Sequence, residues 1–207
     1  MVRIYFLRHG QTDYNLKGIV QGSGVDSNLN DWGRAQAQAA FQAYGQVPFH
    51  AIYASNLKRT HQTLQPWVDA GHRFQIEAGV RELNWGTHEG VIPTPSQIEA
   101  FRGILESWAQ NQLEVTVEGG ENPLQAWDRS RPFFERALEE HKHEQILVCS
   151  HGRQIRVMLS QLTGVGLHNM EQYTHKNTGM SILEMEQIGA GQLLQLNDVR
   201  HLENMIV

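Results

Sequence analysis

The chain has 207 residues, of which 40% are hydrophobic, and its formal net charge at pH 7 is -5. This length and composition are ordinary for a globular protein, and we expect residues 1–207 to form a single domain. The acidic balance argues against nucleic acid and against an anionic membrane as partners, so any positively charged site must be local.

The cysteine content and the hydropathy indicate a cytoplasmic protein. A single cysteine, Cys149, excludes an intramolecular disulfide and favours a reducing compartment. Only four apolar residues separate Arg3 from Arg8, so the N-terminus does not resemble a signal peptide. No apolar run approaches the roughly 18 residues that a membrane-spanning helix needs.

The first half of the chain is expected to alternate strands and helices. Asp31 is the predicted cap of its first long helix, Ser55 the predicted cap of the next, and Pro66 is expected to bend or interrupt that second helix. In chain order the predicted elements are a strand at 2–7, a Gly-rich loop at 17–31, a helix at 34–44, a strand at 50–54, a helix from 55 and a strand at 74–76.

The second half continues the same alternation. Its predicted elements are a loop at 80–96, helices at 97–110 and 123–141, a strand at 145–150, a helix at 153–162, and strands at 180–186 and 192–198 joined as a hairpin. This order predicts an α/β protein, a three-layer α/β/α sandwich with a largely parallel sheet.

Two of the predicted buried strands end on the same dipeptide. His9-Gly10 follows the strand at 2–7, and His151-Gly152 follows the strand at 145–150. Ligands of parallel sheets bind outside the carboxyl ends of the strands, so both histidines are expected at one rim. Glycine beside each histidine is expected to let the backbone approach a bound group.

Two arginines are expected at the same rim. Arg8 ends the first strand, and Arg59 lies one turn into the helix that follows the strand at 50–54. Guanidinium groups are always charged and match the oxygens of phosphate. The rim therefore predicts an anion pocket in which His9 takes a phosphoryl group directly, while Arg8, Arg59 and a protonated His151 compensate its charge.

The proton donor for the leaving oxygen is expected in the segment RELNWGTHEG at 81–90. Glu82 and Glu89 are both candidates for the general acid, and the chemistry alone does not choose between them. Trp85, beside Glu82, is the one tryptophan considered as part of the site.

Five segments together are more specific than any one of them. They read RHGQTDYN at 8–15, SNLKRTHQT at 55–63, RELNWGTHEG at 81–90, EGGENPLQAWDR at 118–129 and SHGRQIRVML at 150–159. In order and spacing they resemble the motifs of the histidine phosphatase superfamily, also called the phosphoglycerate mutase-like fold.

The resemblance implies a metal-independent phosphatase that hydrolyses small phosphomonoesters without a cofactor. It implies that His9 forms a phosphohistidine, that Glu82 rather than Glu89 donates the proton, and that Thr12 and Asn15 help to hold the phosphate pocket. The implied catalytic residues are Arg8, His9, Arg59, Glu82 and His151, and Gly152 is expected beside the bound phosphate.

Three alternatives remain open at this stage. A phosphoglycerate mutase is disfavoured because residues 83–99 contain no Lys or Arg, although Arg81 and Arg102 are candidates to compensate. A non-catalytic phosphate-binding module is disfavoured because all five implied catalytic residues are present. A metallophosphatase lacks a clustered Asp/His pattern, so no metal is expected. Two segments depart from the family pattern, DSNLNDWG at 26–33 and GGEN at 119–122, and they leave the identity of the substrate open. The sequence does not indicate the oligomeric state either.

Two other features are interpreted as structural. His141-Lys142-His143 has metal-like spacing but is expected on a solvated helix end. Cys149 is expected in the core, because a cysteine phosphatase needs arginine six positions later and residue 155 is Ile.

Overall fold

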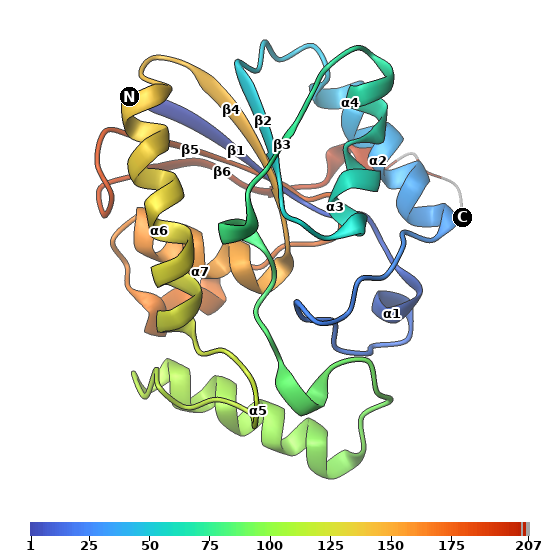
Figure 1. The fold of residues 1–207 in the computed structure, drawn as a ribbon, viewed down its shortest axis with the longest axis vertical. Helices are drawn as coiled ribbons and strands as arrows, with labels where there is room; N and C mark the ends of the chain where they lie inside the picture. The colour runs from blue at the N-terminus through green and yellow to red at the C-terminus, as the bar shows by residue number, and fades with distance from the viewer. Residues whose placement is uncertain (204, 206–207) are drawn as a thin grey trace.

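The protein is built around a six-stranded sheet, shown in Figure 1 by a computed structural model that describes residues 1–203 and 205. The spatial order of the strands is β3-β2-β4-β1-β5-β6. The four strands from β3 to β1 are parallel, and β5 and β6 add two antiparallel pairings. The bounds are β1 Val2–Arg8, β2 Ala51–Ala54, β3 Gln75–Ile76, β4 Gln145–Ser150, β5 Met180–Met185 and β6 Gln192–Asp198.

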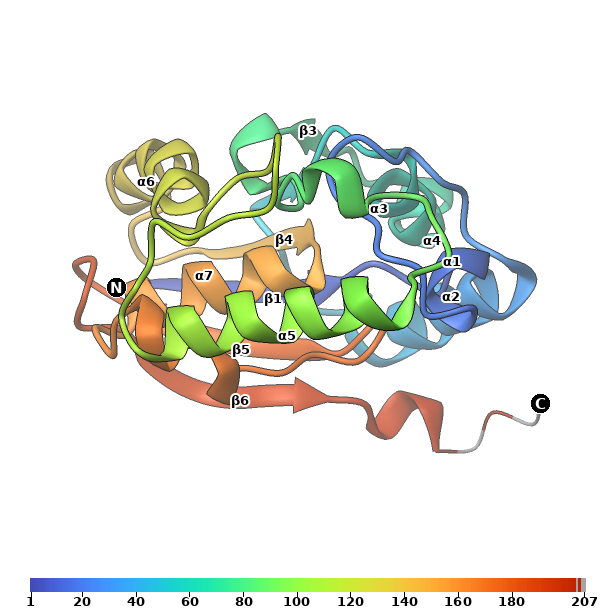
Figure 2. The ribbon, with the colours of Figure 1, turned by 90° about the horizontal axis from the view of Figure 1, so that it is seen from below.

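Helices cover both faces of the sheet, which confirms the predicted three-layer architecture (Figure 2). No helix in the part of the chain that the structure describes is long and apolar enough to span a bilayer. The α-helices are α1 Asp13–Leu16, α2 Asp31–Tyr44, α3 Lys58–Thr63, α4 Gln65–Asp69, α5 Pro95–Ala109, α6 Pro123–Glu140 and α7 Gly152–Leu162. Short 3₁₀ turns are η1 Ala78–Val80, η2 Gly86–His88, η3 Leu167–Gln172 and η4 Arg200–Leu202.

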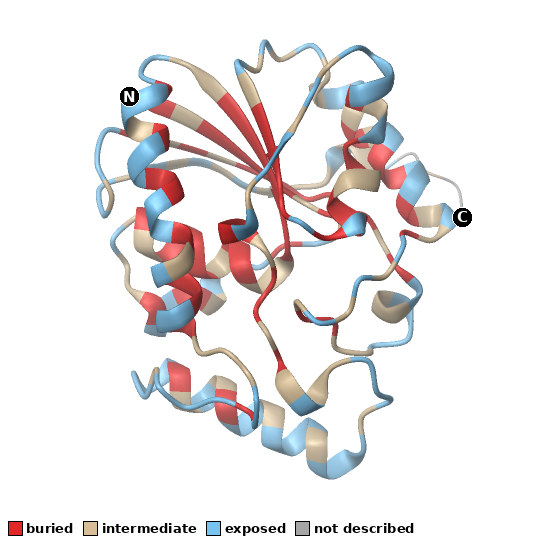
Figure 3. Ribbon diagram, viewed as in Figure 1, coloured by how far each residue is buried: buried red, intermediate tan, exposed pale blue. Residues whose placement is uncertain are grey.

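The alternation of β1 explains the two hydrophobic layers. Ile4 and Phe6 point to the layer of α6 and α7, where they join a cluster that includes Phe134. Leu7 points to the opposite layer, against Trp67 of α4. Because both faces are covered, β1 is buried along most of its length (Figure 3), and its two charged residues, Arg3 and Arg8, lie near its two ends.

Helices α2 and α3 are not capped by the residues that the sequence predicts. Asn30, not Asp31, is the cap of α2, since its side chain accepts a hydrogen bond of 2.8 Å from the backbone N–H of Gly33. Ser55 does not cap α3, which begins at Lys58 and has no side-chain cap. Pro66 interrupts the helix as expected, because it lies in the first turn of the separate helix α4.

The prediction that His141 lies on a solvated helix end is wrong. Its side chain is buried at the C-terminal end of α6, with Nε2 2.7 Å from the hydroxyl of Tyr53 and Nδ1 2.9 Å from a carboxylate oxygen of Glu144. Cys149 lies in the core as expected, where burial raises the pKa of its thiol far above the ordinary value.

Candidate active site

A cleft of about 190 Å³ lies at the carboxyl ends of β1 and β4. The strand ends bring their polar residues to one rim, as the parallel topology requires. Five of the predicted site residues line the cleft, and Trp85 lines it as well. The five are Arg8, His9, Asn15, Glu82 and Gly152.

His9 is held as a neutral imidazole with one free nitrogen. Its Nδ1 lies 2.7 Å from the carbonyl oxygen of Gly10, which can only accept, so Nδ1 carries the proton and Nε2 keeps its lone pair. Burial, and then the charges of Arg59 and Arg8, hold the pKa of His9 well below its ordinary value. An unprotonated Nε2 in the cleft is the state that a nucleophilic histidine requires.

His151 lies directly behind His9, with 5.2 Å between the ring centroids. Its Nδ1 accepts a hydrogen bond of 3.1 Å from Nε of Arg59, and its Nε2 lies 2.7 Å from the hydroxyl oxygen of Ser55. The expectation of a protonated His151 is wrong for this arrangement. Burial and the nearby charge of Arg59 hold its pKa well below the ordinary value, so the ring is neutral.

Arg59 is completely buried and connects the site to the loop before α2. It donates to the carbonyl oxygens of Val25, at 2.6 Å, and Gly22, at 3.2 Å. Burial lowers the pKa of Arg59 to about 10, so it stays charged at neutral pH. Arg59 and His151 lie behind His9 and do not themselves line the cleft.

Arg8 and Gly152 are in close contact. A Cβ atom at residue 152 would come within 3.2 Å of Nε of Arg8, so glycine there allows the guanidinium to lie against the start of α7. Nη1 of Arg8 donates to the carbonyl oxygen of His175, at 2.6 Å, whereas its buried Nε has no partner among the residues that the structure describes. A buried donor without an acceptor is costly, which marks Nε as a group that a bound anion satisfies.

Gly10 has a packing role. A Cβ atom at residue 10 would lie 2.5 Å from the carbonyl oxygen of Gly33, in the first turn of α2. The glycine lets α2 approach the loop after β1, which fixes the backbone that carries His9.

The two candidate carboxylates are separated by the structure. Glu82 lines the cleft, is 7% exposed, and accepts hydrogen bonds from the backbone N–H groups of Leu83, Gln154 and, at 3.2 Å, Arg153. Glu89 lies outside the cleft and accepts from the backbone N–H groups of Trp85 and Gly24. Glu82 is therefore the one of the two carboxylates that lies in the cleft, and Glu89 joins two loops.

Thr12 supports Asn15 instead of facing the cleft. Thr12 is fully buried and caps α1, accepting a hydrogen bond of 3.1 Å from the backbone N–H of Asn15. Asn177 donates both to the carbonyl oxygen of His9 and to Oδ1 of Asn15. This network fixes Asn15 at the cleft wall.

The sequence interpretation missed two basic residues of the cleft, Arg153 and Arg156. Their spacing of three residues, directly after His151-Gly152, places both on one side of the first turns of α7 and could have indicated them. Arg81 and Arg102, the arginines considered from the sequence, do not line the cleft, although residues 83–99 indeed provide no cation.

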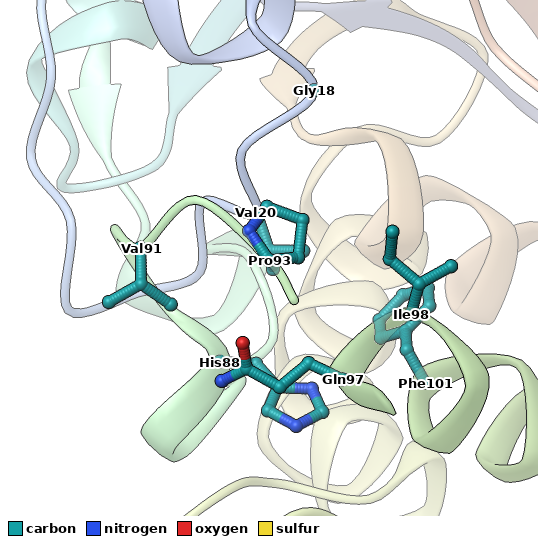
Figure 4. A pocket seen from close by; sticks show the side chains of 8 residues that line it. All are labelled: Gly18, Val20, His88, Val91, Pro93, Gln97, Ile98 and Phe101. Atoms are coloured by element: carbon teal, nitrogen blue, oxygen red, sulfur yellow. The ribbon is translucent and has the colours of Figure 1, made fainter. Parts of the chain in front are cut away.

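An apolar cavity of about 220 Å³ adjoins the cleft and shares Val20 and Phe101 with it (Figure 4). Ile98 and Phe101 of α5 form one side, and Val91 and Pro93 lie on the segment that precedes this helix. A charged cleft next to an apolar cavity is a common arrangement of small-molecule sites.

The buried histidines predict that acid weakens the fold. Burial lowers the pKa of His175 to about 4, whereas an unfolded chain protonates histidine near 6.5. The unfolded state therefore binds more protons below about pH 6.5, and His175 alone is expected to remove about 2 kcal/mol of stability between pH 7 and pH 5. Urea unfolding at pH 7 and pH 5 measures this loss of stability. The loss should be smaller in His175→Gln, because glutamine does not bind a proton in this range. Equal stability of the unmodified protein at both values would contradict the prediction.

The fold and the site together define a class of protein: an α/β domain with a buried, neutral histidine between arginines at the carboxyl edge of its sheet. The chain belongs to the histidine phosphatase superfamily (branch 1), whose family model matches residues 4–199. This agrees with the resemblance of the five sequence segments.

Individual relatives support a phosphatase. The chain is 29% identical over 202 residues to a putative phosphoserine phosphatase 2 of Hydrogenobacter thermophilus, covering 97% of this chain and 98% of the relative. The structure of a mycobacterial glucosyl-3-phosphoglycerate phosphatase superposes with a TM-score of 0.84 at 26% identity, covering 95% and 99% of the two chains. A probable phosphoglycerate mutase of Erwinia tasmaniensis is 27% identical, with 99% and 96% covered. The chain is a histidine-family phosphomonoesterase.

Proposed function

We propose that His9 is the nucleophile of this phosphatase and that the substrate is a small phosphomonoester. The observation that carries the proposal is the hydrogen bond from Nδ1 of His9 to Gly10, which leaves Nε2 unprotonated in a cleft shared with Arg8 and Glu82. A cleft of about 190 Å³ suits a small molecule better than a folded protein. We also propose a cytoplasmic location, without nucleic acid or membrane as partner.

In the first half-reaction, the lone pair on Nε2 of His9 attacks phosphorus while the bond from phosphorus to the ester oxygen breaks. Glu82 gives its proton to the departing oxygen, so the alcohol leaves neutral. A phosphate monoester has a second pKa of about 6, and a substrate that binds as the monoanion supplies the proton that Glu82 needs.

In the second half-reaction, water attacks phosphorus and the bond from phosphorus to Nε2 breaks. Glu82, now a carboxylate, takes a proton from the water, and inorganic phosphate leaves. Arg8, with Asn15 and Gly152 beside it in the cleft, compensates the charge on the equatorial oxygens in both steps, and Arg59 adds its positive charge from behind His9.

A phosphoglycerate mutase is the second candidate, because one relative carries that name and because Arg153 and Arg156 add cations to the cleft. Phosphate release from a panel of phosphomonoesters tests the hydrolase. Conversion of 3-phosphoglycerate to 2-phosphoglycerate, with a trace of 2,3-bisphosphoglycerate present, tests the mutase. Conversion that greatly exceeds phosphate release from every ester would overturn the proposal.

Glu82→Gln is expected to affect esters according to their leaving group. An alkoxide needs a proton to leave, so kcat/KM for an alkyl phosphate should fall by about 10²–10⁴. The p-nitrophenolate ion leaves without help, so p-nitrophenyl phosphate should be affected much less. Parallel assays on both esters measure the difference.

Glu89→Gln is the matched control, because this carboxylate joins Gly24 and Trp85 outside the cleft. Any loss it causes should be the same for both esters. If Glu82→Gln also reduced both esters equally, Glu82 would be a binding or structural residue.

A further inference from the structure

Two guanidinium groups on α7 form a second cationic position in the cleft, separate from the arginines next to His9. Arg153 and Arg156 both line the cleft, and their side chains are only 10% and 20% exposed. Placing two like charges together in a partly dehydrated site costs free energy unless anions compensate them.

The protein supplies only part of that compensation. Glu171 of η3 pairs with both groups. Its Oε1 accepts a hydrogen bond from Nη1 of Arg153, and its Oε2 accepts one from Nη1 of Arg156. Within residues 1–203 and 205, neither guanidinium donates a hydrogen bond to any other group. Nε of Arg156 is buried and has no hydrogen-bond partner in the described part of the chain. The two guanidinium groups therefore share one hydrogen-bonded carboxylate, with Glu82 the other negative charge that acts on them, and most of their N–H groups remain available.

Arg153 is fixed in position by aromatic rings. Its guanidinium carbon lies 5.9 Å from the ring centroid of Trp85 and 6.0 Å from that of Trp108. Burial and the charge of Arg156 lower the pKa of Arg153 to about 9, which keeps it charged at neutral pH. A fixed planar donor is the arrangement that binds a carboxylate with good geometry.

We propose that Arg153 and Arg156 bind a carboxylate on the leaving alcohol, so that the preferred substrates are small phosphorylated hydroxy acids. This inference rests on the proposed phosphatase function. Arg8 and Arg59 already serve the phosphoryl group beside His9, which leaves the α7 pair for another part of the same molecule. The unused N–H groups of the pair match a carboxylate, whose two oxygens accept several hydrogen bonds.

Two pairs of esters test the proposal, because the members of each pair differ at a single carboxylate. O-phospho-L-serine is compared with O-phosphoethanolamine, and 3-phosphoglycerate with glycerol 3-phosphate. The unmodified protein should favour the carboxylate member by about 10- to 100-fold in kcat/KM, the size of a hydrogen-bonded charge pair. Arg153→Gln should remove this preference mainly by raising KM for the carboxylate member, with little change for its partner.

Glu171→Gln separates substrate binding from a structural role. Removing the competing carboxylate should lower KM for the carboxylate esters only. Arg102→Gln, on the exposed side of α5, is the matched control and should change neither ester. If the three residues only hold η3 against α7, Arg153→Gln and Glu171→Gln will instead reduce both members equally and lower Tm, which overturns the proposal.

The unmodified protein distinguishes failure of this inference from failure of the proposed function. Equal hydrolysis of both members of each pair would refute the carboxylate position and leave the phosphatase intact. Release of no phosphate from any ester, p-nitrophenyl phosphate included, would refute the proposed function itself.

Discussion

His9→Ala is expected to reduce phosphate release by at least about 10⁴-fold, because loss of the proposed nucleophile would remove the covalent route entirely. No other described group replaces it in the cleft: His151 has both ring nitrogens engaged, by Arg59 and by Ser55. Cys149 is buried in the core, where its thiol remains protonated. Steady-state hydrolysis of p-nitrophenyl phosphate measures the loss.

The covalent intermediate gives a second readout of the same prediction. Rapid quenching with ³²P-labelled ester should yield protein-bound phosphate that is labile in acid and stable in alkali. His9→Ala should carry no label, and His168→Ala, an exposed histidine, should label normally. Label that persists without His9, or that is found on a serine, would assign the nucleophile to another residue.

The fold was predictable wherever residues close in sequence determine an element. The apolar runs that became β1 and β4 predicted two buried strands, and the parallel arrangement predicted that His9 and His151 lie at one rim. Caps were less predictable. Asn30 and Asp31 are both good capping residues, and packing of Gly33 against the loop after β1 decides that α2 starts after Asn30.

Residues whose role depends on distant contacts were not predictable from the sequence. Ser55 looks like a helix cap, but its hydroxyl serves His151, which lies 96 positions later in the chain. Arg153 and Arg156 look like ordinary solvated residues at a helix start. In the cleft, Glu171 of η3 pairs with both of them, and the rings of Trp85 and Trp108 lie against the guanidinium of Arg153.

Arg8→Ala and Arg59→Ala are each expected to lower kcat/KM by about 10²–10³, the usual effect of removing one preorganised donor to a transition state. Arg8 has a buried Nε without a partner, and Arg59 donates to Val25, Gly22 and His151 with N–H groups to spare. Because both are proposed to act on one phosphoryl group, the double variant should lose less than the product of the single losses. Hydrolysis of one ester by all three variants measures this.

The structural part of the Arg59 effect must be separated from its electrostatic part, since Arg59 holds the segment at 22–25. Orthovanadate should inhibit the unmodified protein competitively, and both Arg8→Ala and Arg59→Ala should bind it more weakly while remaining folded by circular dichroism. Arg34→Ala, an exposed arginine on α2, should change neither activity nor inhibition.

Near-normal activity of Arg59→Ala would exclude Arg59 from the site. An unfolded Arg59→Ala would leave Arg59→Lys as the deciding variant: it keeps the charge but loses the planar donor, so a folded Arg59→Lys with full activity would contradict the role proposed for the guanidinium.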